Sequence, residues 1–262
     1  MIRAYRAELV KLLRRKVLLV TAAIVVVAAV GGAAIVLAAA KPAARAVGER
    51  TPTIEGLSRA GGGTDVFRDI TSFSGTFLFV VFIGLLAAEF SRGTIRTSLL
   101  HQPRRVPLLA GKLAALLTFA AGALAAMEVV TWLASRVLAP GQGVVTHGWT
   151  SLSALGAALD DYGSVLLWVT AYAALATMVA VLLPSVPIAL GVGIAWAGPF
   201  EHLLQDAWKP AAKVFPGLLL EAFGAGGTTE VTAGRALATV AIYAGAASVI
   251  AAAVFTRRDV TA

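Results

Sequence analysis

The chain alternates long uncharged apolar runs with short polar connections. A helix needs about 20 apolar residues to cross the hydrocarbon core of a bilayer, which is about 30 Å thick. The runs near this length, together with one shorter run, predict six transmembrane helices at residues 17–40, 70–88, 113–135, 162–183, 186–200 and 236–255. The pattern therefore predicts an all-α, polytopic membrane protein in which residues 1–262 form a single transmembrane domain.

The longest run has 39 residues without a charge, from Tyr162 to Phe200. A single straight helix of that length would measure about 58 Å, roughly twice the hydrocarbon thickness. Because Pro184 and Pro187 interrupt helical hydrogen bonding, the run is expected to fold back at this point. It then supplies a fourth transmembrane helix and a short fifth one.

The segments outside these runs predict shorter elements. Residues 1–16 carry apolar and basic side chains at helical spacing, which predicts an amphipathic interfacial helix on the membrane surface. Residues 201–232 contain two apolar pieces too short to cross, which favours re-entrant-like helices dipping into the outer leaflet before the last span. Residues 41–69 are expected to form a polar outer loop with one short helix, and Asp160-Asp161 to cap the fourth span.

Composition agrees with a membrane protein and narrows the chemistry. Hydrophobic residues make up 58% of the chain, and its mean hydropathy is +0.84. A soluble fold of this size has too little interior to hide so much apolar side chain. The sequence has no cysteine, and its three histidines lie in separate loops without acids to complete a metal site. No metal ligand is therefore expected.

The distribution of charge predicts an orientation. Placing both termini and the 89–112 loop on one side gives that side 13 Lys and Arg against three acids. The remaining segments carry nine Lys and Arg against ten acids, apart from Glu128 inside a span. Because short basic loops stay in the cytoplasm, both termini and this loop are expected there. The net charge of +8 thus indicates a lipid membrane as the partner and no nucleic acid.

The choice of residues also indicates a source. Ala, Val, Arg and Gly are used heavily, which is typical of a high-GC bacterial genome. The membrane is then expected to be the bacterial cytoplasmic membrane, crossed several times.

The 24-residue loop from Glu89 to Lys112 is the most informative connection, because five of its residues are basic and only one is acidic. Gly93-Thr94 can break one helix and cap the next, and Pro103 closes a short helix between them. The loop therefore predicts a structured docking surface. Its candidate residues are Glu89, Arg92, Gly93, Thr94, Arg96, Leu99, Leu100, Pro103, Arg104, Arg105 and Lys112.

The sequence contains neither a catalytic constellation nor a nucleotide-binding motif. Leu109-Ala-Gly-Lys112 ends like a phosphate-binding loop, but it lacks the upstream Gly and the following Ser or Thr. The chain is therefore expected to be no enzyme, and any ATP hydrolysis would take place in a partner chain.

The candidate loop residues resemble the loop after the second span of ABC-transporter permeases of the type-2 export class. In that family an acid at the membrane edge precedes Gly-Thr, a hydrophobic pair, a Pro with a nearby Arg, and a Lys that opens the third span. Here the two arginines directly follow Pro103, so either Arg104 or Arg105 is the counterpart. The basic N-terminal helix around Glu8, the six spans and the closing segment 255–260 extend the resemblance over essentially the whole chain.

The resemblance implies the membrane-spanning permease subunit of an ABC exporter, coupled through this loop to a separate ATPase. It implies two ATPase chains, which bind ATP and Mg²⁺, and a second permease chain that is identical or homologous. This chain would hold no cofactor. Leu99 and Leu100 would be buried in a groove of the ATPase, with basic residues at its rim, namely Arg92, Arg96, Arg104 and Arg105.

Two further roles are expected inside the loop. Glu89 lies where the second span meets the cytoplasm and is expected to pair with Arg92 or Lys112, which would tie the second span to the third. Gly93 would permit the sharp break between the span and the short helix.

Glu128 is the only acid well inside a predicted span. An acid there costs about 2.5–3.5 kcal/mol on insertion scales, so it is expected to face protein or water. It is a candidate substrate-pathway residue, or else it forms a hydrogen bond with Thr131, Tyr172 or Thr177. Two other functions stay open: a proton-coupled secondary transporter or channel that uses Glu128, and a membrane scaffold without a transport role.

Overall fold

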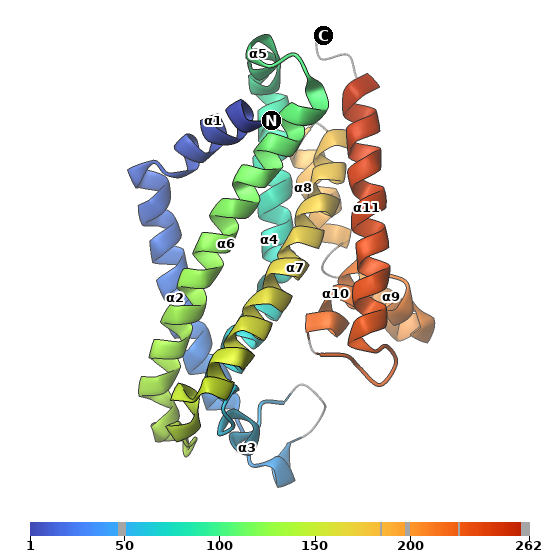
Figure 1. The fold of residues 1–262 in the computed structure, drawn as a ribbon. Helices are drawn as coiled ribbons and strands as arrows, with labels where there is room; N and C mark the ends of the chain where they lie inside the picture. The colour runs from blue at the N-terminus through green and yellow to red at the C-terminus, as the bar shows by residue number, and fades with distance from the viewer. Residues whose placement is uncertain (47–50, 184, 197–199, 225, 258–262) are drawn as a thin grey trace. The chain divides into compact units, whose positions relative to one another are not determined.

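The computed structural model describes residues 1–46, 51–183, 185–196, 200–224 and 226–257 (Figure 1). Its α-helices are α1 (Ile2–Leu12), α2 (Arg15–Ala39), α3 (Ile54–Leu57), α4 (Gly62–Ser91), α5 (Thr94–His101), α6 (Arg105–Leu138), α7 (Leu152–Leu182), α8 (Val186–Ala195), α9 (Glu201–Ala207), α10 (Pro216–Gly224) and α11 (Ala233–Arg257). Short 3₁₀ turns are η1 (Ala43–Arg45), η2 (Ala139–Gln142), η3 (His147–Thr150) and η5 (Lys209–Lys213). The described residues form no strand, which confirms the all-α prediction for this part of the chain.

Four of the described helices are long and apolar enough to cross a membrane: α2, α6 with the turn after it, α7 and α11. α4 is a fifth if its two parts, Gly62–Ser72 and Phe77–Ser91, form one span. Large apolar side chains of α2, such as Val27 and Ile35, are exposed as lipid-facing residues are. The chain is therefore a helical membrane protein.

The crossing predicted at 186–200 is not confirmed. α8 has 10 residues, which is about 15 Å of helix and half the hydrocarbon thickness. Residues 197–199 lie outside the described part of the chain. The break before α8 agrees with the prediction, since α7 ends at Leu182 and α8 begins at Val186, although Pro184 itself is not described.

The chain divides into two compact units. Unit 1 consists of Met1–Leu12, Ser74–Phe119 and Leu167–Ala262, and unit 2 of Leu13–Phe73 and Ala120–Leu166. Unit 1 therefore contains α1, α5 and the whole Glu89–Lys112 loop. Glu128 belongs to unit 2.

The core of unit 1 joins α5 to α1, α6, α7 and α11. One hydrophobic cluster contains the buried side chains of Ala4, Ile95, Leu108, Leu109, Val181, Ala251 and Phe255. Phe90, near the end of α4, packs edge-on against Phe255 with ring centroids 5.8 Å apart. An isolated helix of eight residues is unstable in water, so this packing is what holds α5 in place.

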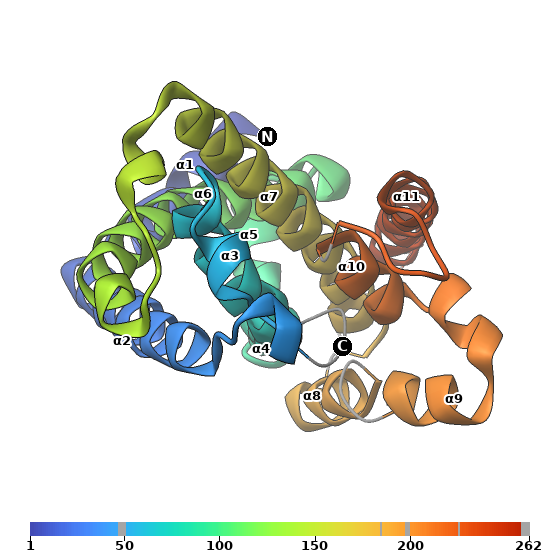
Figure 2. The same cartoon turned by 90° about the horizontal axis from the view of Figure 1, so that it is seen from below.

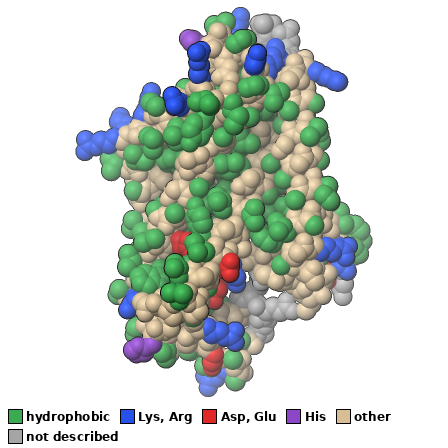
Figure 3. Space-filling model, in the orientation of Figure 1, with side chains coloured by type: hydrophobic (Ala, Val, Ile, Leu, Met, Phe, Trp, Pro, Cys, Tyr) green, Lys and Arg blue, Asp and Glu red, His purple; other side chains and the backbone are tan. Residues whose placement is uncertain are grey.

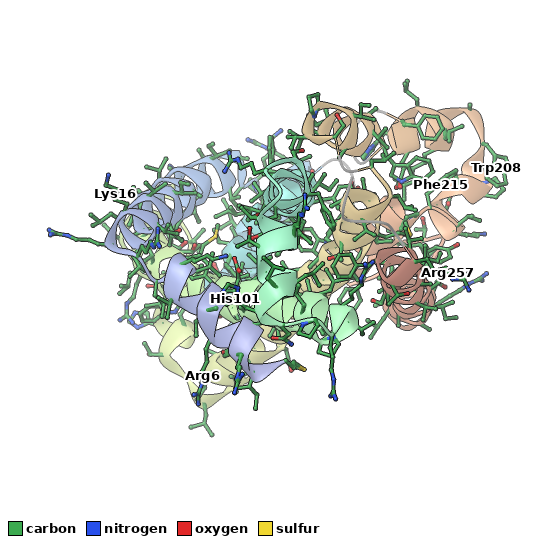
Figure 4. All side chains as sticks on the ribbon, turned by 90° about the horizontal axis from the view of Figure 1, so that it is seen from above. Arg6, Lys16, His101, Trp208, Phe215 and Arg257 are labelled. Carbon is green, nitrogen blue, oxygen red and sulfur yellow. The ribbon has the colours of Figure 1, made fainter. Side chains whose placement is uncertain are left out.

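Two short helices, α9 and α10, correspond to the two apolar pieces predicted in 201–232, and α10 packs along α11 (Figure 2). Glu201 is buried and its Oε2 accepts a hydrogen bond from the backbone N–H of Leu218 at 2.9 Å, near the start of α10. Burial raises the pKa of Glu201. The ring of Phe215 packs edge-on against that of Trp196. It packs edge-on against Trp208 as well (Figure 4). That this segment dips into the outer leaflet stays a prediction.

In unit 2, α4 begins well before Ile70, its predicted start. Residues 41–69 were expected to be a loop, but α4 starts at Gly62 and carries Arg68 inside the helix. The Nη1 of Arg68 donates to Oδ1 of Asp161 at 3.2 Å, which gives the charge a partner within the protein. Asp161 lies inside α7, which begins at Leu152, so the prediction that it caps a helix is wrong.

Candidate functional site

The short helix in the loop forms where the sequence predicts it. Gly93 has φ +67°, the left-handed conformation that glycine adopts without steric cost, and it ends α4 and begins α5. The hydroxyl of Thr94 donates to the carbonyl of Glu89 at 3.1 Å, which satisfies an orphan carbonyl at the end of α4. α5 ends at His101, and Pro103 follows two residues later. Gly93, Thr94 and Pro103 therefore delimit α5.

The two leucines of α5 differ in their surroundings. Leu99 is partly buried and packs against the hydrophobic cluster of unit 1, together with the fully buried Ile95. Leu100 is 80% exposed. Successive residues of an α-helix point about 100° apart, so a helix anchored through Ile95 and Leu99 must turn Leu100 outward. Of the two leucines, Leu100 is the one available to a partner.

The basic residues of the loop also separate into two kinds. Arg92, Arg96 and Arg104 are exposed. The Nη1 of Arg105 instead donates to the carbonyls of Phe255 and Thr256, at 3.1 and 3.3 Å. These carbonyls lie at the C-terminal end of α11, where unpaired acceptors and the helix dipole favour a cation. Arg105 therefore ties the loop to α11.

Lys112 occupies the centre of a buried ion cluster. Its Nζ lies 2.9 Å from Oε2 of Glu8 and 2.8 Å from Oε2 of Glu89. Lys11 completes the cluster at 2.9 Å from Glu8 and 3.8 Å from Glu89. The side chain of Lys112 is only 3% exposed, whereas that of Lys11 is 48% exposed. The prediction that Glu89 pairs with Lys112 is confirmed, and the cluster joins the end of α4 to α6 and α1.

Glu8 is the member of this cluster to which sequence reasoning gave no role. Burial raises its pKa, but the hydrogen bonds and charges of Lys112 and Lys11 outweigh that effect and hold the pKa below its ordinary value. Glu8 therefore stabilises the fold as a carboxylate, and this stabilisation is lost as the pH falls through its lowered pKa. The available signal was that Glu8 is the only acid in the basic segment 1–16.

α1 also approaches α6 closely at Gly111. A Cβ atom at this position would lie 2.7 Å from the carbonyl oxygen of Met1 and 2.9 Å from the Cβ of Ala4. Further along, the hydroxyl of Tyr5 donates to that of Thr118 at 3.3 Å. Sequence reasoning missed Gly111, since only the contact between α1 and α6 makes its missing side chain necessary.

The exposed face of this part of unit 1 is strongly basic. Lys and Arg side chains gather over α1, α5 and the end of α11 (Figure 3). They belong to the exposed residues Arg3, Arg6, Lys11, Arg92, Arg96, Arg104 and Arg257. Arg258 and Asp259, the remaining charges near the C-terminus, lie outside the described residues.

Glu128 lies in α6 and belongs to unit 2, whereas the residues of the Glu89–Lys112 loop belong to unit 1. Its Oε1 is buried and has no hydrogen-bond partner among the described residues. The Oγ1 of Thr131 is likewise buried without a partner there, so the predicted Glu128–Thr131 hydrogen bond is not formed. The hydroxyl of Thr177 donates to the carbonyl of Ala173 at 2.6 Å instead.

Comparison with protein-family models and with curated proteins gives no match to this chain. The geometry itself defines what the loop residues do. Glu89, Arg105 and Lys112 tie the ends of four helices together, and α5 with Leu100 projects from this junction.

Proposed function

We propose that this chain is the membrane-spanning permease subunit of an ABC exporter. α5 is its coupling helix and docks in a groove of a separate ATPase, which binds ATP and Mg²⁺. Two such ATPases act on two permease chains, identical or homologous, in a bacterial cytoplasmic membrane. Both termini and α5 face the cytoplasm. Under this proposal the chain supplies the pathway, and the partner supplies the energy.

The observation that carries the proposal is the exposure of Leu100 on α5, a helix that packs into unit 1 through Ile95 and Leu99. A large apolar side chain that is 80% exposed, at the tip of a basic connection, loses contact with water only if a partner covers it. Apolar anchors carry most of the affinity of an interface, and charges around them tune recognition and association rate. Arg92, Arg96 and Arg104 surround this anchor in the manner of a basic rim.

The ion cluster supplies a route for the movement. Closure of the ATPases would displace α5, and the displacement would reach α6 through Lys112 and α1 through Glu8. Because these side chains are buried and mutually bonded, α1, α4 and α6 would move together at this end as one rigid body. Rigid-body motion driven by different binding energies of two states is a common way to switch a transport pathway between its inward and outward forms.

The proposal predicts that ATPase activity co-purifies with the tagged chain from its native host and depends on Leu100. Leu100→Asp should reduce the co-purified ATPase by about tenfold or more, because an acid in an apolar groove loses the anchor and adds a buried charge. ATP hydrolysis and the band of the bound subunit are measured in the same eluate.

Leu152→Asp is the matched control, since Leu152 is 90% exposed and belongs to unit 2. It should retain the ATPase in full. Leu99→Asp is unsuitable, because Leu99 packs within unit 1 and its loss would damage the fold. Equal ATPase in the eluates of the Leu100 and Leu152 variants, or none with the unaltered chain, would overturn the proposal.

A further inference from the structure

Unit 2 contains an excess of acidic groups around a single ion pair. Arg68 lies 3.2 Å from Asp161 and 3.6 Å from Asp65. Asp69 and Glu128 both interact electrostatically with Asp161, and Arg59 with Asp65. Asp160 also interacts electrostatically with Asp161, so five carboxyl groups share two arginines. Crowded carboxyl groups of this kind are neutralised either by taking up protons or by binding an additional cation.

A second observation points to a ligand in the same place. Oxygen atoms of Glu128, Thr131 and Ser135 are buried and have no hydrogen-bond partner among the described residues. Thr131 and Ser135 are both fully buried, at 0% exposure. Such hydroxyls usually bond to a backbone carbonyl one turn earlier, and leaving them unpaired costs free energy that lipid cannot restore. The nearby Nε of Arg68 is the corresponding unpaired donor.

The three residues lie on one side of α6. Positions 128, 131 and 135 fall on one face of α6, at intervals of about 4.5 and 6 Å along its axis. α6 meets the two acid-bearing helices of unit 2 at two levels, α4 beside these residues and α7 about two turns earlier. A Cβ at Gly63 of α4 would lie 2.8 Å from Trp132, and the hydroxyl of Tyr162 of α7 donates to the carbonyl of Ala121 at 3.0 Å.

We propose that this row of acceptors in unit 2 binds a linear aliphatic amine that carries more than one ammonium group. Each primary ammonium has three N–H donors and no acceptor, which matches a carboxylate oxygen and hydroxyls that lack donors. A row about 10 Å long suits an extended molecule better than a compact ion. The methylene segments between ammonium groups tolerate the apolar surroundings of a membrane helix.

Taken as a substrate class, this assignment rests on the proposed exporter function, whereas the binding site itself does not. Binding by the isolated chain requires no ATPase. Loss of ATPase docking with intact amine binding would therefore count against the exporter alone, and the reverse result would count against the amine site alone.

The test measures binding of spermidine to the full chain in an uncharged detergent by isothermal titration calorimetry. Spermidine should bind saturably, and octane-1,8-diol, an uncharged molecule of similar length, should neither bind nor compete. Glu128→Gln keeps the shape and removes the charge, and it should weaken spermidine binding by about tenfold or more. Ser135→Ala should weaken it by about threefold to tenfold through loss of one acceptor.

Glu55→Gln is the matched control, because it makes the same exchange at an exposed acid of unit 2, whose Oε2 accepts a hydrogen bond from the backbone N–H of Ala43. It should change the dissociation constant by no more than about twofold. Thermal unfolding of each variant verifies its fold, and Ser135→Ala decides the matter if Glu128→Gln unfolds. The inference is wrong if spermidine does not bind, if the diol competes with it, or if Glu128→Gln and Glu55→Gln bind it equally.

Discussion

Lys112 holds its charge in the interior of unit 1 because two carboxylates offset it there. Glu8 and Glu89 each lie within 2.9 Å of its Nζ, and Lys11 balances the second negative charge. Burial of an ion pair adds little net stability when both partners are present, since desolvation offsets the attraction. Removal of one buried partner is different, because it leaves the other charge without compensation.

We therefore expect Lys112→Met to destabilise the protein by about 3–5 kcal/mol, since two largely enclosed carboxylates, 12% and 19% exposed, lose their main partner. Lys11→Met removes the same charge from the same cluster, but that side chain is 48% exposed, and its loss should cost about 1 kcal/mol or less. Thermal unfolding of the two variants in the same detergent compares them directly. Equal losses of stability would mean that the cluster is solvated and that Lys112 has no special place in it.

At the residue scale, the sequence predicted contacts between neighbours better than contacts across the fold. The Glu89–Lys112 pair was expected because both residues bound one loop. Glu8 and Lys112 are 104 positions apart in the sequence, and no local pattern predicts that they pair. Leu99 and Leu100 were treated alike, because a hydrophobic pair in sequence does not reveal which member faces its own core.

α5 is an element whose limits can be derived from backbone chemistry. Gly93 adopts φ +67°, and no atom lies within 4 Å of the position that its Cβ would occupy. A Cβ at this site would meet no neighbour, so the cost of adding one comes from the backbone alone. The left-handed conformation costs other L-residues about 1–2 kcal/mol of free energy, and it costs Asn less.

Gly93→Ala and Gly93→Leu should therefore lose nearly the same stability, about 1–2 kcal/mol, and Gly93→Asn should lose less. Gly111→Ala is the contrasting variant, because its Cβ would lie 2.7 Å from the carbonyl of Met1 and must push α1 away from α6. Denaturant unfolding ranks the four variants. A Gly93→Leu variant far less stable than Gly93→Ala would show that the site is crowded, and the backbone explanation would fail.

Within the proposed exporter, Gly93→Leu should also keep the ATPase bound while uncoupling hydrolysis from export.

The starts and ends of the other elements follow the sequence less closely where tertiary pairing intervenes. Asp65 and Arg68 made residues 62–69 look like a loop, yet Asp161 of α7 accepts a hydrogen bond from Arg68 and lets α4 extend to Gly62. At 186–200 the length of the uncharged run predicted a longer helix than α8, which has 10 residues. An uncharged run indicates that a segment avoids water, and it does not specify whether one continuous helix or several short ones achieve this.

For the whole molecule, the lengths of the uncharged apolar runs identified a membrane protein and most of its long helices. The distribution of Lys and Arg predicted how these helices are oriented in the membrane. The long helices α2, α6, α7 and α11 agree with four of the six predicted spans. Burial of Glu8, the direction of Leu100 and the unpaired oxygens of α6 depend on packing between distant segments, so composition and spacing did not reveal them. The orientation in the membrane stays a prediction from the positive-inside rule.

Two exposed histidines test that orientation, because α6 lies between them and the chain has no native cysteine. His101 ends α5 in the basic loop, and His147 begins η3. If α6 crosses the membrane once, the two positions lie on opposite sides, and the basic loop lies on the side that resists translocation.

A membrane-impermeant maleimide should label His147→Cys in intact cells and His101→Cys only after permeabilisation. Both variants replace the same residue type at exposed sites, so a difference in labelling reports sidedness rather than reactivity. Labelling of His101→Cys from outside intact cells would reverse the orientation and remove the basis for an ATPase docking on α5, whereas equal labelling of both would mean that α6 does not cross.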